Sequence, residues 1–187
     1  YPETTCVYGI NRLCSSGLQA VATVANAISS GEISCGIAGG VESMSNGNMM
    51  DAVNPNLLSE QVFENEKAQN CLMPMGITSE NVAAEFGVDR ATQDKMAVES
   101  HRKAAHALKM GWSQKEVTPY KTFVKDKDGN QKEVLVDKDD GCRPQTTFEG
   151  LQKLKPAFQK NGTTTAGNSS QVTDGAAAIL LCRRDVA

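Results

Sequence analysis

The stretch SSGLQAVATVANAI, residues 15–28, has apolar side chains at the spacing of an α-helix. One face of this predicted helix is apolar, at Leu18, Val21, Ala22, Ala25 and Ile28. Gly31 follows as the usual stop signal at a helix C-terminus. A helix with one apolar face needs a second layer to pack against, so this stretch predicts a layered fold.

Short β-prone segments lie on both sides of this helix. Residues 6–10 predict a short strand, and residues 34–41 are a run of small and branched residues typical of a buried strand. Gly36, Gly39 and Gly40 would let another backbone approach this second strand closely. Residues 5–43 therefore predict strand, helix and strand, which is half of an α/β layer.

The pattern changes over residues 44–162, where helices and a hairpin replace the buried strands. The predicted elements are a loop at 45–55, a helix capped by Thr78 through Phe86, a helix capped by Asp89 through about Met110, a hairpin of 117–124 and 132–136 around Gly129, and a short helix at 147–154. The longer helix is expected to pack a face that includes Met96 and Ala97. This zone predicts a mixed α+β insertion.

The last zone returns to the composition of a buried strand. Residues 175–182, GAAAILLC, follow a polar, glycine-bearing loop at residues 162–171. A sheet that is interrupted after Val41 and resumes near Gly175 accounts for this order. We expect residues 1–43 and 163–187 to form one incomplete α/β domain, and residues 44–162 to form an inserted loop domain.

Length and charge exclude several classes of function. The chain has 187 residues, 40% of them hydrophobic, and a net charge of -3. It therefore has no basic field for a nucleic-acid backbone, and no apolar run of about 18 residues predicts a membrane span. It begins without Met and without a basic or apolar leader, so we expect its first residue to be an internal one.

The six cysteines form no Cys-x-x-Cys pair and the chain has two histidines, so no metal site is expected. Cys6, Cys35 and Cys182 lie beside apolar residues and are expected to be small buried groups.

Cys14 differs from these because it lies at the junction of a predicted strand and the predicted helix. The unpaired amides of a first helical turn point toward such a position, and the helix dipole favours the thiolate, which is the reactive form. Ser15, Ser16 and Gly17 leave room for a substrate, and the same amides could hold a developing oxyanion. The residues leave two interpretations open: a nucleophile, or a buried cysteine at a turn.

Five segments resemble the thiolase family, in the family's order and across nearly all of the chain. They are NRLCSSGLQAV at 11–21, GGVESMS at 39–45, PMGITSENVA at 74–83, LKPAF at 154–158 and GTTTAGNSS at 162–170. Within the family, the sequence most resembles the peroxisomal 3-ketoacyl-CoA thiolases. The resemblance implies a thiolase half-domain of α/β class, interrupted by a loop domain, and only the nucleophile-bearing part of the enzyme.

The resemblance also implies roles for particular residues. Cys14 would be the nucleophile of a ping-pong cleavage of 3-ketoacyl-CoA in fatty-acid β-oxidation, and its amide one oxyanion donor. Met75 would line the substrate pocket, and Arg143 would lie near the adenine end of CoA. The loop that contacts the pantetheine arm would include Ala166, Gly167 and Ser170. CoA is then a substrate, no tightly bound cofactor is implied, and the family implies a homodimer in the peroxisome.

Three segments of the family are absent from this sequence: Gly-His-Pro, Cys-x-Gly and Asn-Glu-Ala-Phe. His101 and His106 are five residues apart on a predicted helix, so we expect surface or loosely packed positions for both. By comparison with the family's sheet, three strands would remain and two would be missing. We therefore expect part of a longer polypeptide, inactive by itself.

Two alternative functions stay open, an acetyl-CoA acetyltransferase and a catalytically silent CoA-binding module. Pro74, where many short-chain acetoacetyl-CoA thiolases have His, favours the degradative thiolases. Cys71 lies just upstream, and we expect either a buried thiol there or one that forms a disulfide with Cys14 on oxidation.

Overall fold

The computed structural model describes residues 2–47 and 54–187. The chain divides into two compact units, residues 1–58 with 172–187, and residues 59–171. Most of the predicted loop at 45–55 lies outside the described residues. The domain boundaries expected after residue 43 and before residue 163 stay a prediction.

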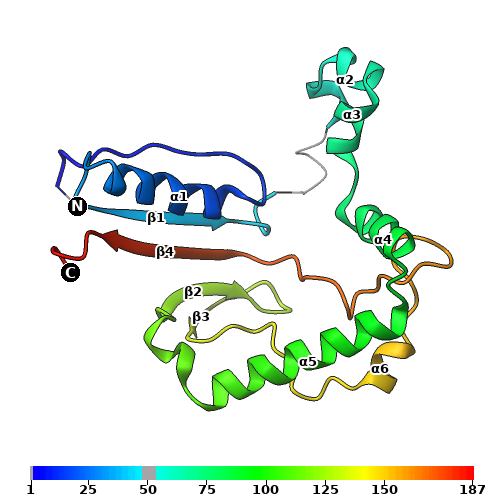
Figure 1. The fold of residues 1–187 in the computed structure, drawn as a ribbon. Helices are drawn as coiled ribbons and strands as arrows, with labels where there is room; N and C mark the ends of the chain where they lie inside the picture. Colours follow the sequence, from blue (N-terminus) through cyan, green and yellow to red (C-terminus); the bar gives the residue numbers. More distant parts are fainter. Residues whose placement is uncertain (1, 48–53) are drawn as a thin grey trace. The chain divides into compact units, whose positions relative to one another are not determined.

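The first unit joins the two ends of the chain in one small sheet. Strand β1 (Cys35–Glu42) pairs antiparallel with strand β4 (Gly175–Cys182), with Ala38 opposite Ile179. Helix α1 (Ser16–Ser29) lies along this pair (Figure 1). The prediction that the sheet is interrupted after β1 and resumes in β4 is confirmed.

Close packing between α1 and β1 depends on Gly36. A Cβ atom on this residue would lie 2.8 Å from Cγ1 of Val24, so the absence of a side chain lets α1 approach the strand. At Gly39 the close neighbour is backbone, because a Cβ atom there would lie 3.0 Å from the carbonyl oxygen of Ala177. The helix ends as predicted, and Gly31 follows it with a φ of +78°.

The strands of this unit are more exposed than expected. Ala38 is the buried residue of β1, whereas Ile179 and Leu180 of β4 are exposed. Helix α1 is the element that packs on the pair, and the described residues of the first unit place nothing on the opposite face. The predicted burial of both strands is therefore wrong for the described part of the chain.

Two related expectations are also wrong. Residues 6–10 form no strand, because no described strand of the first unit lies beside them to accept their hydrogen bonds, so the sheet has two strands rather than three. Cys6 and Cys35 are exposed and Cys182 is half-buried, because the described residues include no second layer that packs over them.

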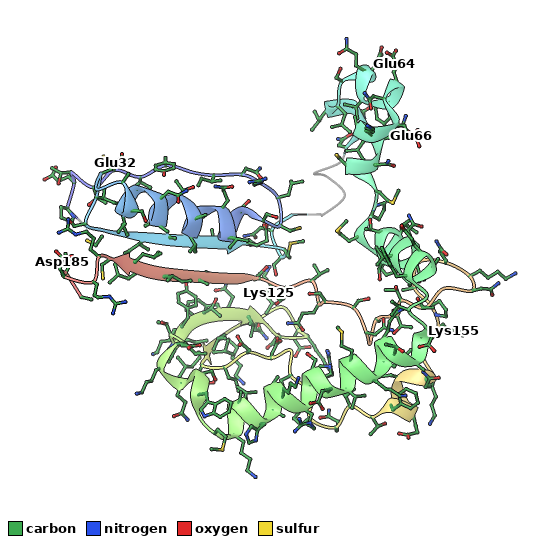
Figure 2. The ribbon with its side chains drawn as sticks, in the orientation of Figure 1. Glu32, Glu64, Glu66, Lys125, Lys155 and Asp185 are labelled. Atoms are coloured by element: carbon green, nitrogen blue, oxygen red, sulfur yellow. The ribbon has the colours of Figure 1, made fainter. Side chains whose placement is uncertain are left out.

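The second unit contains helices and a separate hairpin. Its longer elements are α4 (Met75–Phe86), α5 (Arg90–Lys109), β2 (Tyr120–Lys125), β3 (Gln131–Val136) and α6 (Phe148–Gln152). The shorter ones are α2 (Glu60–Glu64), α3 (Glu66–Gln69), η3 (Asn70–Leu72) and η4 (Trp112–Lys115), while the turn η2 (Pro55–Leu57) belongs to the first unit. Figure 2 labels two exposed lysines of the second unit, Lys125 at the end of β2 and Lys155 beyond α6.

Side-chain caps explain where two of these helices begin. The Asp89 carboxylate accepts a hydrogen bond of 2.7 Å from the amide of Thr92, as predicted for α5. The Thr147 hydroxyl accepts one of 3.1 Å from the amide of Gly150 at the start of α6. The predicted start of α4 at Thr78 is wrong, because the Thr78 amide already donates to the Pro74 carbonyl inside the first turn.

The buried residues of the second unit are mostly polar. Ala83 and Leu151 are its buried apolar residues, and Glu80, Asp94, Thr164 and Thr165 are its buried polar ones. The prediction that α5 packs a face including Met96 is wrong for this residue, which is 72% exposed. In the described part of the chain, no helix combines the length and the apolar composition needed to cross a membrane.

The β2–β3 hairpin turns around Gly129, as predicted, and its turn is held by Asp126, which the sequence did not single out. One carboxylate oxygen of Asp126 accepts hydrogen bonds of 2.9 Å from the amides of both Asp128 and Asn130. Those bonds, from Asn130 above all, hold the pKa of Asp126 below its usual value. Gly129 completes the turn with a φ of +84°, in the left-handed region that favours glycine.

Substituting this glycine tests the turn. Gly129→Ala should destabilise the protein by about 1 kcal/mol, because an L side chain is strained at this backbone conformation. Gly9→Ala is the matched control, since a Cβ atom there also meets open space and the φ is not in that region. Urea unfolding of both variants provides the measurement, and equal free energies of unfolding would contradict the expectation.

Candidate active site

Cys14 is exposed and lies in a tight turn directly before α1. The amide of Ser15 donates to the carbonyl of Arg12 at 3.1 Å, and the amide of Ser16 donates to the carbonyl of Leu13 at 3.0 Å. Leu13 has a φ of +51°, which costs an L residue about 1–2 kcal/mol. Strain of this kind persists where the surrounding structure fixes it, and it is common at functional sites.

Side chains next to Cys14 fix this turn. The Asn11 side-chain carbonyl accepts a 3.0 Å hydrogen bond from the amide of Leu13. The hydroxyl of Ser16 accepts one of 2.8 Å from the amide of Arg12 and donates one of 2.6 Å to the carbonyl of Leu13. The predicted alternative of a buried cysteine is wrong for the described chain, and the nucleophilic role of Cys14 stays a prediction.

The other predicted site residues belong to the second unit. Met75 is the first residue of α4 and is 67% exposed. Arg143 is exposed, and its amide donates to Nδ1 of His101 at 3.2 Å. His101 is half-buried and His106 is exposed, in line with the loosely packed positions expected for both.

The remaining three predicted residues, Ala166, Gly167 and Ser170, share the loop of residues 162–170. Ala166 and Ser170 are exposed, while Gly167 is half-buried. The structure therefore brings these three together on one loop, in a different unit from Cys14. Cys71 of the second unit is exposed rather than buried, and its disulfide with Cys14 stays a prediction.

Glu80 of α4 holds the beginning of this loop. Its side chain is buried, with 5% of the residue exposed, and its carboxylate accepts hydrogen bonds from the amide of Thr163 at 2.8 Å and the amide of Thr164 at 2.8 Å. The Thr163 hydroxyl donates a further bond of 3.0 Å. Burial alone would raise the pKa of Glu80, but these bonds outweigh it and the pKa lies below its usual value.

Asp94 of α5 holds the end of the same loop. Its fully buried carboxylate accepts hydrogen bonds from Nδ2 of Asn168 at 2.9 Å, from Nε of Arg90 at 2.7 Å and from Nε2 of Gln152 at 2.7 Å. The side chain of Asn168 in turn accepts a 2.7 Å bond from the Thr165 amide. Two acidic residues from neighbouring helices thus fix one loop.

Sequence reasoning missed Glu80 and Asp94, because an acidic residue on an amphipathic helix is expected to face water. One available signal was the composition of the loop. Its threonines and Asn168 bring many hydrogen-bond donors into one short segment, and donors that become buried need acceptors nearby.

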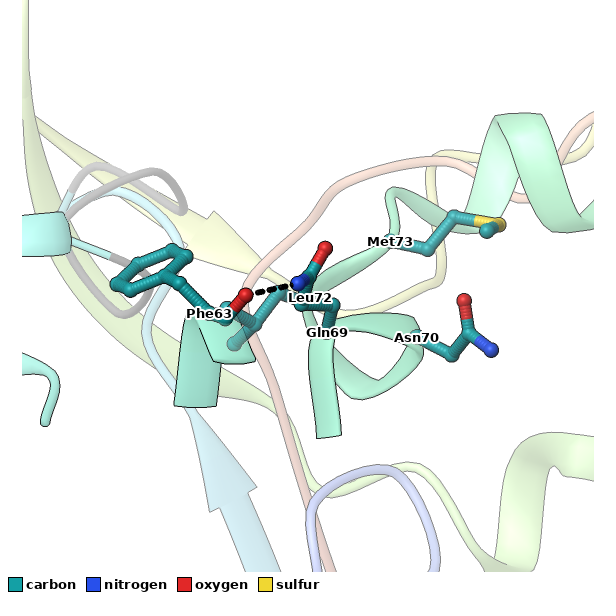
Figure 3. A pocket seen from close by; sticks show the side chains of 5 residues that line it. All are labelled: Phe63, Gln69, Asn70, Leu72 and Met73. Atoms are coloured by element: carbon teal, nitrogen blue, oxygen red, sulfur yellow. Dashed lines mark hydrogen bonds between the residues drawn. The ribbon is translucent and has the colours of Figure 1, made fainter. Parts of the chain in front are cut away.

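Two shallow hollows lie in the second unit, and none of the predicted site residues lines either of them. One is lined by Phe63, Leu72 and Met73 with Gln69 and Asn70, and the side chain of Gln69 donates to the carbonyl of Phe63 (Figure 3). The other lies beside Glu80, between the end of α4 and residues 161–163.

Comparison with known families decides what kind of protein contains this site. The family described as thiolase, N-terminal domain, matches residues 1–185. The chain belongs to the thiolase family.

Relatives and solved structures refine this assignment. The chain is 54% identical over 186 residues to the human protein named 3-ketoacyl-CoA thiolase, peroxisomal, and 55% identical over 190 residues to an Arabidopsis thaliana 3-ketoacyl-CoA thiolase 1, peroxisomal. All of the chain is covered in both comparisons, but only 43% of the human protein and 42% of the plant protein. The chain thus spans less than half the length of these thiolases.

A solved structure has the same fold. The dimeric peroxisomal thiolase of Saccharomyces cerevisiae matches with a TM-score of 0.84 and 46% identity, over 99% of this chain and 45% of that one. Human mitochondrial 3-ketoacyl-CoA thiolase matches with a TM-score of 0.74 and 34% identity, over 95% of this chain and 46% of that one. The fold is therefore that of a thiolase N-terminal half-domain, with mixed helices and strands.

The ionised form of Glu80 should contribute to stability in a pH-dependent way. Its pKa in the folded protein lies below the usual 4.5, so this contribution is complete above about pH 4.5 and is lost as the pH falls through the lower folded value. Glu80→Gln removes the charge-assisted bonds and should cost about 2 kcal/mol at pH 7. The difference in unfolding free energy between wild type and variant, measured from pH 7 to pH 3, should shrink; a constant difference would contradict this.

The surroundings of Cys14 should make it the fastest-reacting thiol. We expect iodoacetamide at neutral pH to label Cys14 about tenfold faster than Cys6, because the proposed nucleophile must react readily with electrophiles. Cys6 is the internal control, since it is exposed in the same unit but lies outside any helix. Peptide mapping of a labelling time course gives both rates, and equal rates would support the silent module instead.

Proposed function

We propose that the protein containing this chain cleaves 3-ketoacyl-CoA with CoA, giving acetyl-CoA and an acyl-CoA shortened by two carbons, as in fatty-acid β-oxidation. The observation that supports this most is the exposed Cys14, held in a strained, hydrogen-bonded turn at the start of α1 within a thiolase half-domain. The names of the peroxisomal relatives support the same substrate class.

Cys14 would carry the acyl group between two half-reactions. Its thiolate attacks the 3-keto carbon, and the carbonyl oxygen becomes an oxyanion for which the Cys14 amide would be one donor. The bond between carbons 2 and 3 then breaks, its electron pair stays on carbon 2, and a proton added there gives acetyl-CoA. The thiolate of a second CoA attacks the thioester on Cys14 and releases the shortened acyl-CoA.

The proton transfers need groups that this sequence does not supply. The family's Gly-His-Pro, Cys-x-Gly and Asn-Glu-Ala-Phe segments do not occur in it. His101 and His106 lie in Ser-His-Arg and Ala-His-Ala, and neither lies in a Gly-His-Pro segment. We infer that the chain by itself is inactive.

The binding roles follow the same proposal. Met75 would line the acyl pocket, and Arg143 would meet the adenine end of CoA through stacking or a phosphate contact. Ala166, Gly167 and Ser170 would contact the pantetheine arm. CoA is a substrate in this scheme, and no other cofactor is invoked.

Domain organisation, assembly and location belong to the same proposal. Residues 1–43 and 163–187 would form the incomplete α/β domain and residues 44–162 the loop domain. A homodimer is supported by the dimeric yeast relative, and a peroxisomal location by the peroxisomal relatives. An acetyl-CoA acetyltransferase would differ by preferring acetoacetyl-CoA over longer 3-ketoacyl chains in a chain-length series.

Replacing the nucleophile tests the proposal. In the intact protein, Cys14→Ser should lower the rate of thiolysis by at least about a thousandfold, because the acyl-enzyme can no longer form at a useful rate. Cys6→Ser is the control and should retain the wild-type rate. The substrate should leave an acyl adduct on the Cys14 peptide of the wild type, seen by mass spectrometry; full activity of Cys14→Ser would refute the mechanism.

A further inference from the structure

Two buried carboxylates hold the loop of residues 162–170 from the side opposite its exposed residues. We propose that Glu80 and Asp94 are positioning residues, which fix this loop in the shape that receives the pantetheine arm of CoA. The inference rests on the proposed function, which assigns Ala166, Gly167 and Ser170 to that arm. It adds two residues that the resemblance to thiolases did not single out.

Glu80 depends on the loop for its hydrogen bonds. Within the described residues no cation pairs with it, and its carboxylate accepts from the amides of Thr163 and Thr164 and from the Thr163 hydroxyl. A buried carboxylate without these donors would be strongly destabilised. The ionised form of Glu80 and the folded loop therefore require each other.

Asp94 connects the end of the loop to two helices. Asn168 donates to it and also donates a 3.0 Å bond to the carbonyl of Thr163, which ties the end of the loop to its beginning. Arg90, which pairs with Asp94, also donates to the carbonyls of Leu151 at 2.5 Å and Leu154 at 3.1 Å. The loop, α5 and the end of α6 thus share one carboxylate.

Two glycines bring the loop backbone into direct contact with these supports. A Cβ atom on Gly162 would collide with the carboxylate of Glu80. One on Gly167 would lie 2.5 Å from side-chain atoms of both Leu151 and Leu154. The loop backbone has little room to shift, so a change at its anchors is transmitted to the loop rather than absorbed by a gap.

The loop has distinct inner and outer sides. Thr164 and Thr165 are buried, with 4% and 0% of each residue exposed, whereas Ala166 and Ser170 are exposed. Glu80 and Asp94 contact the inner side and are themselves buried. They act through the loop and not on the substrate, so their effect should fall on CoA binding rather than on the reaction at Cys14.

The experiment uses the intact protein with Glu80→Gln and Asp94→Asn. The matched controls are Glu85→Gln for Glu80 on α4 and Glu99→Gln for Asp94 on α5. The side chains of Glu85 and Glu99 are not buried. We expect both test variants to raise the Kd for CoA, measured by calorimetry, and the KM for CoA by at least about tenfold. The rate of Cys14 alkylation and kcat at saturating CoA should stay within about twofold of wild type, and the controls should resemble wild type throughout.

A milder variant decides the question if either test variant does not fold. Thr163→Val removes only the hydroxyl that donates to Glu80 and accepts a 2.8 Å bond from Gln93, and should raise the Kd for CoA about threefold. Wild-type affinity in the folded variants, or in Thr163→Val alone if the others do not fold, would overturn the proposal. Equal losses in kcat and in the alkylation of Cys14 would overturn it as well, since they indicate general damage.

The same measurements separate this inference from the proposed function. If the wild type binds CoA but carries out no thiolysis, the proposed function fails while a raised Kd in the variants still supports the positioning role. If the wild type is an active thiolase and the variants bind CoA normally, the positioning role fails alone. A wild type that binds no CoA would overturn both.

Discussion

The second unit depends on carboxylates placed inside it. Glu80 and Asp94 leave water only because amides, hydroxyls and the Arg90 guanidinium replace the lost hydration. The unit has few buried apolar residues, so these hydrogen bonds supply the specificity that a larger apolar core would otherwise provide. Removing one partner would leave a charge or a set of donors unsatisfied, and for this reason the loop and both helices behave as one piece.

The first unit follows a different principle. Its turn at Cys14 has a strained backbone at Leu13, whose amide donates to the Asn11 side chain and whose carbonyl accepts from the Ser16 hydroxyl. These bonds fix the backbone on both sides of Cys14, whose thiol is exposed in the described chain.

Local signals predicted the elements well, and tertiary context decided the rest. The periodicity of residues 15–28, the cap at Asp89 and the turn at Gly129 were sufficient because each acts within a few residues. Burial of β1 and β4, and a strand at residues 6–10, required partners that the described first unit does not place beside them. The roles of Glu80 and Asp94 required the folded loop, since the sequence does not show which acidic residue of a helix faces inward.

The pairing of β1 with β4 has a consequence for synthesis of the chain. Residues 35–42 emerge from the ribosome long before residues 175–182, yet each supplies the hydrogen-bonding partner of the other. Until residues 175–182 are made, β1 lacks the strand that it pairs with, whereas the second unit, whose contacts lie within residues 59–171, can already form. The β1–β4 pairing is therefore a contact of long sequence separation, and contacts of this kind form more slowly than the local contacts within α1.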